Sequence, residues 1–325
     1  MAGRGSRYWH GLIALMARVL LLVGLVFLPV LPGVAKGLMA NTLARPDGSM
    51  IHYELDIPDA PARTALLVLL QGSGCAPVAQ NANLAAIRTL FAGFAALTVD
   101  KYGVDPARPL DVNDLDCPPE FHAHHTVSQR VADYAGVIAQ LRGAPWWNGE
   151  LVLFGGSEGG LVAAILAGEV SADAAVLLST GGGLPFGEMV RQTIPPEGWP
   201  TVDQAFAMAR ENPDSAETWA GSSYRFWADI IDRRVGDDMI KADTAFLLIQ
   251  GGNDPSSPVE TARIVSDLFA AAGRCNLTYW ELPGYDHAMA DAGGVSHMSE
   301  VGADAAGWVR ARLASRSEAG CLADN

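Results

Sequence analysis

Short apolar runs recur along the chain, and most of them end at a glycine-rich or polar stretch. Apolar runs bounded by turn residues are typical of strands that are buried on both faces of a sheet. They lie at residues 65–70, 94–99, 151–154, 174–179 and 244–250, and a more mixed strand is expected at 277–282. Residues 50–57 alternate between apolar and polar side chains, which predicts an antiparallel strand at an edge of the sheet.

Segments with helical periodicity separate these strands. Thr126 and Gln129 have the spacing of a capping box, and Gly143 is placed to end the helix that they begin. Its apolar face would hold Val127, Val131, Tyr134, Ile138 and Leu141. Further helices are expected at 259–272 and from about 297 to 313. This alternation predicts an α/β fold, in which helices cover both faces of a mainly parallel central sheet.

Residues 184–242 interrupt this alternation, because the segment is long and mixed in charge. It contains three tryptophans, Trp199, Trp219 and Trp227. We predict a mostly helical cap here, inserted into a core made of residues 41–183 and 243–325. The tryptophans either form the core of this cap or line an apolar pocket, and the sequence does not separate the two interpretations.

The N-terminal segment, residues 1–35, is expected to lie outside this fold. It has the basic start, apolar stretch and small-residue exit of a signal peptide. The alternative is an uncleaved anchor that tethers the protein to a membrane. Either interpretation predicts export, to the periplasm or as a secreted protein. The net charge of −14 argues against a nucleic-acid partner, which would require a basic surface.

One serine lies where a strand is expected to turn directly into a helix. Ser157 is flanked by Gly155 and Gly159 in the pattern G-x-S-x-G, after an apolar run and before an alanine-rich one. A turn this tight holds the serine in a strained conformation and exposes its hydroxyl at the helix N-terminus. The amides there favour the negative charge that develops during acyl transfer. Ser157 is therefore a candidate nucleophile.

Two later strand ends carry the groups that would activate such a serine. Asp254 follows the strand at 244–250, and His287 follows the last strand. Active groups of parallel sheets gather at the carboxyl ends of the strands, so His287 is the candidate base and Asp254 the carboxylate that orients it. Asp254 would otherwise serve as a turn or helix-cap carboxylate. Asp286 is a poorer partner because adjacent side chains diverge, and His297 lies at a helix start.

The order Ser157, Asp254, His287 on such a fold resembles the α/β-hydrolase superfamily, in its serine esterase and peptidase branch. The resemblance extends over residues 50–313. It implies that the N–H groups of Ser73 and Glu158 form an oxyanion hole, although Gln71 stands where a histidine is common. It also implies hydrolysis of a carboxylic ester through an acyl-serine, with a small-molecule ester or peptide as substrate and no cofactor or metal. A peptidase or amidase is the alternative, and a non-catalytic binding protein is a more distant one.

Other polar residues near these motifs are given structural roles. We interpret the Glu158 carboxylate as a favourable charge at a helix N-terminus rather than a catalyst. His122, His124 and His125 form a local cluster, but a catalytic zinc site requires three protein ligands and an open position, and no matching fourth group is evident in the sequence. We expect these histidines to line the mouth of the site or to lie on the surface.

The four cysteines gain significance from the predicted export, because disulfides persist in oxidising compartments. Cys75 and Cys117 lie in loops that leave the sheet at the same edge. Cys275 lies at the opposite edge, and the last helix should bring Cys321 back toward it. The topology therefore predicts the pairs Cys75–Cys117 and Cys275–Cys321, since the other pairings would span the sheet. The alternative is four buried free thiols.

Overall fold

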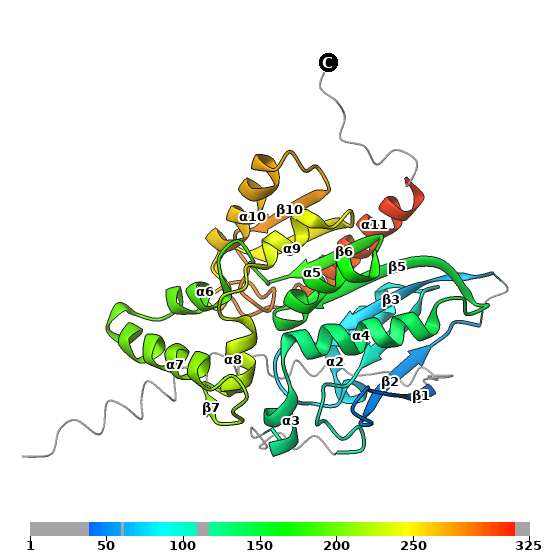
Figure 1. The fold of residues 1–325 in the computed structure, drawn as a ribbon. Helices are drawn as coiled ribbons and strands as arrows, with labels where there is room; N and C mark the ends of the chain where they lie inside the picture. The colour runs from blue at the N-terminus through cyan, green and yellow to red at the C-terminus, as the bar shows by residue number, and fades with distance from the viewer. Residues whose placement is uncertain (1–38, 60–61, 109–116, 316–325) are drawn as a thin grey trace, which may run out of the picture.

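The computed structural model describes residues 39–59, 62–108 and 117–315 of the 325-residue chain (Figure 1). The predicted signal peptide or anchor at residues 1–35 lies outside this part. Within it, one eight-stranded sheet has the order β1-β2-β4-β3-β5-β6-β9-β10. Its strands are β1 (Met39–Ala44), β2 (Met50–Asp56), β3 (Thr64–Leu70), β4 (Ala95–Val99), β5 (Trp147–Gly156), β6 (Ala174–Leu178), β9 (Ala245–Gly251) and β10 (Leu277–Leu282). The pairs from β4 to β10 are all parallel, so the predicted fold class is confirmed.

Helices cover both faces of this sheet. One face carries α4 (Val127–Leu141), α5 (Glu158–Val170), α9 (Val235–Lys241) and α10 (Val259–Ala271), and the other carries α2 (Ala82–Leu90) and α11 (Met298–Ala314) (Figure 1). Strand β3 shows why a continuous apolar run was required. Its side chains at 66, 68 and 70 enter the core under α4 and α5, whereas those at 67 and 69 pack toward α2.

The predicted antiparallel strand is present, but its position at the edge was wrong. Strand β2 pairs on one side with β4 and on the other with β1, and both pairings are antiparallel. Strand β1 is therefore the edge strand. Its side chains are exposed or half-buried, so this strand lacks the apolar pattern that identified the others.

Helix α4 begins as predicted, because the Thr126 hydroxyl oxygen accepts the Gln129 N–H at 2.9 Å. In a full capping box the Gln129 side chain would bind the N–H of Thr126. Here it donates instead to Oδ1 of Asp133, at 2.8 Å. All five residues of the predicted apolar face are buried. Helix α3 (Pro119–His124) and the short helix η1 (Val78–Gln80) lie in the loops that precede α4 and α2.

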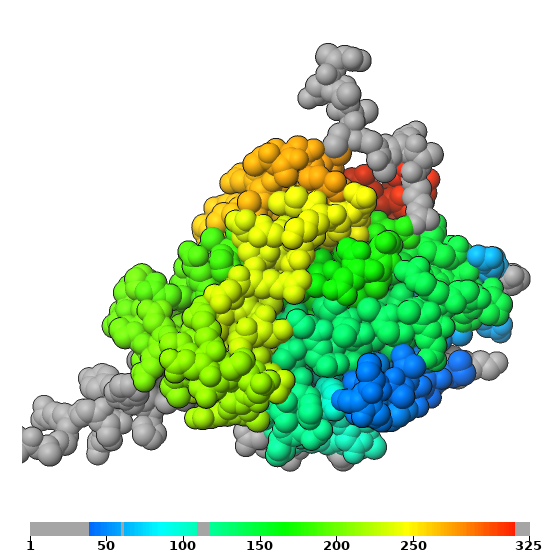
Figure 2. Space-filling view, in the orientation of Figure 1, coloured from blue at the N-terminus to red at the C-terminus, as the bar shows by residue number. Residues whose placement is uncertain are grey.

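The insertion projects beyond the sheet on the side where the parallel strands end (Figures 1 and 2). It contains α6 (Phe186–Gln192), η2 (Pro196–Gly198), α7 (Trp199–Glu211), β7 (Thr218–Trp219), β8 (Ser222–Ser223) and α8 (Tyr224–Ile230). Helix α9, which also falls within 184–242, packs instead on the sheet with α5 and α10. The part that projects as a cap thus ends before α9.

Two of the three cap tryptophans pack together. The ring centroids of Trp219 and Trp227 are 5.2 Å apart, and Phe206 lies 5.5 Å from Trp227. Trp199 instead stacks under the guanidinium of Arg191, whose carbon lies 3.9 Å from the ring centroid. Trp219 and Trp227 therefore contribute to the cap's own core.

A disulfide joins Cys75 to Cys117, with their α-carbons 5.6 Å apart, as the topology predicted. It fastens the loop after β3 to the segment that leads into α3. The second predicted pair ends at Cys321, outside the described residues, so the pairing Cys275–Cys321 stays a prediction.

Candidate active site

Ser157 lies at the turn between β5 and α5 in a strained backbone conformation, with φ 54° and ψ −125°. L-residues rarely adopt a positive φ, and such strain is concentrated at functional sites. The flanking glycines explain how the chain fits. A β-carbon on Gly155 would collide with the Gly159 carbonyl, and one on Gly159 would collide with the carbonyl of Leu70. The G-x-S-x-G spacing is therefore a packing requirement of this turn.

Asp254 and His287 form a hydrogen-bonded pair. Nδ1 of His287 lies 2.8 Å from Oδ2 and 3.0 Å from Oδ1 of Asp254. The Asp254 side chain is completely buried, whereas 18% of the imidazole is exposed. This arrangement directs the N–H of Nδ1 at the carboxylate and leaves Nε2 as the ring nitrogen free for proton transfer.

Asp254 is itself held on several sides. Its Oδ1 accepts the N–H groups of Ser256 and Ser257 at 2.8 and 2.9 Å. Its Oδ2 accepts the side-chain amide of Gln250 at 2.7 Å. Because these donors fix both oxygens, the carboxylate presents a defined orientation to the imidazole of His287.

Strand topology brings these groups to one edge of the sheet. Ser157, Ser179, Asp254 and His287 follow β5, β6, β9 and β10, which are neighbours in the sheet. Ser179 also has a positive φ of 51°, and its hydroxyl donates to the carbonyl of His287 at 2.9 Å. The loop that carries the imidazole is thus tied to the end of the strand next to Ser157.

The two competing residues have other partners. Oδ1 of Asp286 accepts the N–H groups of Ala288 and Ala290 and so shapes the turn after His287. His297 lies between Glu300 and Asp291, at 2.7 and 3.2 Å, and these hydrogen bonds raise its pKa. Each residue is thus held by contacts of its own, apart from the hydrogen bonds between Asp254 and His287.

The Glu158 side chain does not simply lie at a helix end, as we expected, but forms a buried charge cluster. Its Oε1 lies 2.7 Å from Nη1 of Arg130, 2.9 Å from Nζ of Lys101 and 3.2 Å from Nε2 of His125. At most 7% of any of these four side chains is exposed. We call these four residues the Glu158 cluster. Two cations compensate one carboxylate where water does not reach.

Burial and mutual charge shift the titrations within the Glu158 cluster. Burial lowers the pKa of Lys101 to about 8 and that of His125 to about 4, although Glu158 opposes both shifts. Burial alone would raise the pKa of Glu158, but Lys101, His125 and Arg130 together hold it well below its ordinary value. At neutral pH the cluster therefore contains two cations, one anion and a neutral imidazole.

His125 corrects our expectation for the histidine group. It is buried, and its ring stacks between Phe121 of α3 and Phe226 of the cap helix α8, with centroids 4.3 and 5.5 Å away. His124 is partly exposed and stacks on Tyr102. Among residues 39–59, 62–108 and 117–315, no group of three or more potential ligands is arranged to hold a metal ion.

The Glu158 cluster also contacts the loop after β3, in which Ser73 is implied as an oxyanion donor. Lys101 Nζ donates to the carbonyl of Gly72 at 2.7 Å, and Arg130 Nη2 donates to the carbonyl of Gln71 at 2.8 Å. A β-carbon on Gly72 would lie only 3.7 Å from that of Ser157, so this loop lies against the nucleophile turn. Within the described residues, the N–H groups of Ser73 and Glu158 donate to no protein atom.

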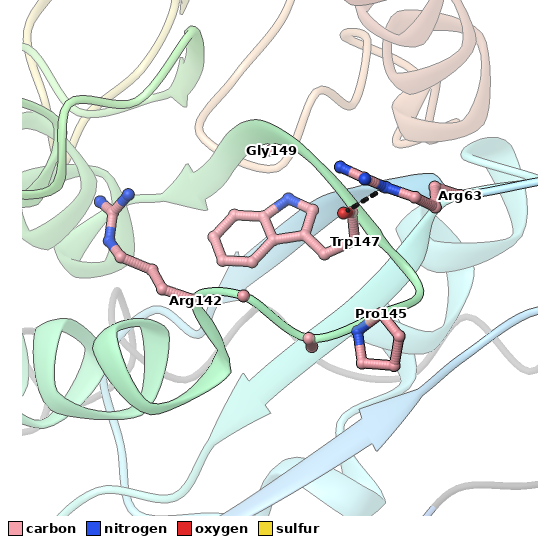
Figure 3. A pocket seen from close by; sticks show the side chains of 7 residues that line it. Arg63, Arg142, Pro145, Trp147 and Gly149 are labelled. Carbon is pink, nitrogen blue, oxygen red and sulfur yellow. Dashed lines mark hydrogen bonds between the residues drawn. The ribbon is translucent and has the colours of Figure 1, made fainter.

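A cavity of about 280 Å³ lies elsewhere, at the start of β5 (Figure 3). Arg63, Arg142 and Trp147 are among the residues that line it. Trp147 pairs with Thr64 at the start of β3 and Gly155 pairs with Leu70 at its end, so Trp147 lies about 20 Å from the end of β5 that carries Ser157. Both arginines already donate to backbone carbonyls. This cavity is remote from the candidate chemistry.

Sequence reasoning missed Lys101, Arg130 and Gln250. A signal for Arg130 was available, because it falls three residues after Val127 and thus on the buried face of α4. Lys101 lies two residues after the buried strand β4, at the edge where functional groups gather. Their common partner, Glu158, could not be inferred from spacing along the chain.

Comparison with known proteins supports the architecture. No known protein-family model matches the chain, and no curated protein sequence matches it. Among solved structures, it is similar to Est1E from Butyrivibrio proteoclasticus, with 18% identity, a TM-score of 0.59 and coverage of 85% of this chain and 99% of that one. It is also similar to the mouse alpha/beta hydrolase domain-containing protein 10, with 15% identity and a TM-score of 0.53. That match covers 85% of this chain and 99% of the mouse protein. A puromycin-hydrolyzing peptidase of Mycobacterium tuberculosis matches with 16% identity and a TM-score of 0.59, over 86% of this chain and 40% of that one.

Proposed function

We propose that this protein, which has the α/β-hydrolase fold, is a serine hydrolase that cleaves a carboxylic ester through an acyl-serine intermediate. The observation that carries the proposal is the pair formed by Asp254 and His287 at the sheet edge where Ser157 occupies its strained turn. A nucleophile, a base and a group that orients the base are the minimum set for this chemistry.

Each residue has one role in this mechanism. His287 Nε2 removes the proton of the Ser157 hydroxyl as its oxygen attacks the ester carbonyl carbon. Asp254 keeps the proton of the imidazole on Nδ1 and stabilises the imidazolium that forms. The N–H groups of Ser73 and Glu158 bind the oxyanion. The imidazolium then protonates the leaving alcohol, and a water molecule, activated by the same imidazole, hydrolyses the acyl-serine to release the acid.

The comparisons bear on the choice between an ester and an amide substrate. Est1E, of which this chain covers 100%, has also been solved with ferulic acid bound, so it supports a substrate with a carboxylic acyl group and, because the correspondence spans all of Est1E, the first candidate. The puromycin-hydrolyzing peptidase supports the second candidate, an amidase or peptidase, but this chain spans only 40% of its length. The same three residues would serve either bond.

Matched chromogenic substrates test the proposal. We expect the purified protein to hydrolyse p-nitrophenyl acetate or butyrate, and Ser157→Ala to reduce kcat by several orders of magnitude without changing the fold, because removing a nucleophile leaves only binding and oxyanion stabilisation. Ser256→Ala, in the loop after β9, is the control. Faster turnover of the matching p-nitroanilide would favour the amidase, and unchanged ester hydrolysis by Ser157→Ala would contradict the whole assignment.

We also propose that the protein acts outside the cytoplasm. The disulfide between Cys75 and Cys117 supports this location, because such bonds persist in oxidising compartments. In the described part of the chain, none of the helices is both long and apolar enough to span a membrane. Fractionation of cells that express the full chain, with sequencing of the mature N-terminus, distinguishes export with cleavage from a membrane tether.

A further inference from the structure

We infer that Lys101 is a positioning residue of the oxyanion hole, which orients the peptide unit between Gly72 and Ser73 so that the Ser73 N–H points at the reacting carbonyl oxygen. The inference rests on the proposed function. It assigns to a buried lysine, outside the catalytic residues, a defined effect on transition-state stabilisation.

The direction of the Ser73 N–H depends on the geometry of one peptide. The Gly72 carbonyl and the Ser73 N–H belong to the same planar unit, and in a trans peptide they point in opposite directions. Lys101 Nζ donates to that carbonyl at 2.7 Å. An ammonium group that holds the carbonyl on the cluster side therefore holds the N–H toward the opposite side, and rotating the peptide would break this bond.

The ammonium group of Lys101 is itself held in place. Nζ also donates to Glu158 Oε1 at 2.9 Å, and the Lys101 side chain is fully buried. Glu158 is the residue whose own N–H is the second oxyanion donor, directly after Ser157. Lys101 thus connects the side chain of Glu158, whose N–H is one donor, to the peptide that carries the other donor, the Ser73 N–H.

Arg130 completes a parallel connection. Its Nη1 and Nη2 bind Glu158 Oε1 and the Gln71 carbonyl, at 2.7 and 2.8 Å. Two consecutive carbonyls of the loop are therefore held by two cations that share one carboxylate. Such fixed donors cost no reorganisation when charge develops, which is how an oxyanion hole lowers a barrier.

Charge reinforces this geometry. With His125 neutral, the Glu158 cluster contains one cation more than it contains anions. A charge that bonds to the carbonyl end of a peptide also polarises its N–H, and screening by water is absent at this depth. The excess positive charge would stabilise an oxyanion bound on the far side of the peptide.

The test compares Lys101→Met with wild type in the full-length protein. The change leaves Arg130 paired with Glu158, so no buried charge loses its partner. We expect kcat for p-nitrophenyl acetate to fall about tenfold to a hundredfold, less than the roughly 10²–10³-fold cost of deleting a donor directly. KM should stay within about threefold. Affinity for an alkyl trifluoromethyl ketone, which forms a tetrahedral oxyanion with the serine, should fall by the same factor as kcat.

Control variants distinguish a positioning role of Lys101 in the oxyanion hole from a role in stability alone. Lys241→Met removes an exposed lysine from α9 and should change neither kcat nor inhibitor affinity. Wild-type kcat and inhibitor affinity in well-folded Lys101→Met would overturn the inference, as would a rise in KM alone. Those outcomes leave the proposed function intact. A wild-type protein that hydrolyses no ester, or a Ser157→Ala variant as active as wild type, would overturn both.

A second variant carries the test if Lys101→Met does not fold. In Lys101→Leu the Gly72 carbonyl also lacks its donor, while Arg130 keeps its ion pair with Glu158. We expect the same selective loss of kcat and inhibitor affinity. Wild-type values for both quantities in folded Lys101→Leu would also contradict the inference.

Discussion

Asp254 and Glu158 are two buried carboxylates at the same edge of one sheet, and they have opposite surroundings. Asp254 faces a single imidazole that remains partly exposed, and its other contacts are neutral hydrogen-bond donors. Glu158 faces two cations and a neutral histidine, all inaccessible to water. The first environment suits a group that orients a base during proton transfer. The second suits a fixed charge that holds backbone in place, so the partners of a carboxylate decide its role.

The largest expected effect is that of Asp254→Asn on turnover. The amide keeps the size of the side chain but favours the wrong tautomer of His287, which in a serine protease with the same arrangement costs about 10⁴-fold in kcat. We expect a loss of that order in ester hydrolysis here. Loss of one buried hydrogen bond should cost only about 1–3 kcal/mol of unfolding free energy. Steady-state kinetics and urea unfolding measure the two quantities.

Asp286→Asn is the matched control for this change, since it alters the carboxylate next to His287 along the chain. The Asp286 carboxylate accepts the backbone N–H groups of Ala288 and Ala290, whereas the Asp254 carboxylate binds the imidazole of His287. Its variant should retain most of the activity. A severe loss with Asp286→Asn, together with near-normal turnover of Asp254→Asn, would reverse the assignment.

Glu158→Gln should mainly lower the free energy of unfolding, whereas Asp254→Asn mainly lowers turnover. Neutralising the carboxylate leaves Lys101 and Arg130 as buried cations without an anion. Breaking a buried ion pair in this way costs about 3–5 kcal/mol. Urea unfolding should show that loss, whereas Glu260→Gln, at an exposed ion pair of α10, should change stability by less than about 1 kcal/mol. Equal stability of both variants would contradict a structural role for the cluster.

The smallest effect concerns pH and His125. Its pKa in the folded protein is about 4, below its ordinary value of 6.5, because burial disfavours the charged ring. The unfolded chain therefore binds the proton first as pH falls from 6.5, and unfolding becomes steadily easier until about pH 4. His125→Phe, which keeps an aromatic ring between Phe121 and Phe226, should reduce this acid-dependent loss.

Thermal midpoints of wild type and His125→Phe between pH 7 and 4 measure that difference. The comparison must be between the two proteins, because Asp100 titrates in the opposite sense. Burial raises the pKa of Asp100 to about 6, so protonation of this residue favours the folded state as pH falls. Parallel midpoint curves for the two proteins would show that His125 does not cause the slope.

The sequence was informative where structure is local. Apolar runs located strands β3, β4, β5, β6 and β9, and glycines that leave no room for a β-carbon located the turn at Ser157. Asp254 and His287 could be paired in advance because parallel strands bring their carboxyl ends to one edge. The disulfide between Cys75 and Cys117 followed from the same topology.

The Glu158 cluster could not be predicted in this way. Its members come from the end of β4, the start of α4 and the start of α5, and they meet through long side chains. Spacing along the chain says which edge a residue occupies but not how far a lysine or arginine reaches. Strand β1 was missed for a different reason, since an exposed edge strand is stabilised by backbone pairing rather than by an apolar pattern.

The central claim is that Ser157 is the nucleophile, and covalent labelling tests it most directly. A fluorophosphonate probe reacts with a serine that a neighbouring base activates, and peptide mapping identifies the labelled residue. We predict a single modification, at Ser157, which is absent from Ser157→Ala and strongly slowed in His287→Ala. Labelling at Ser73, Ser179 or Ser256 instead, or no labelling of the folded wild-type protein, would contradict the account.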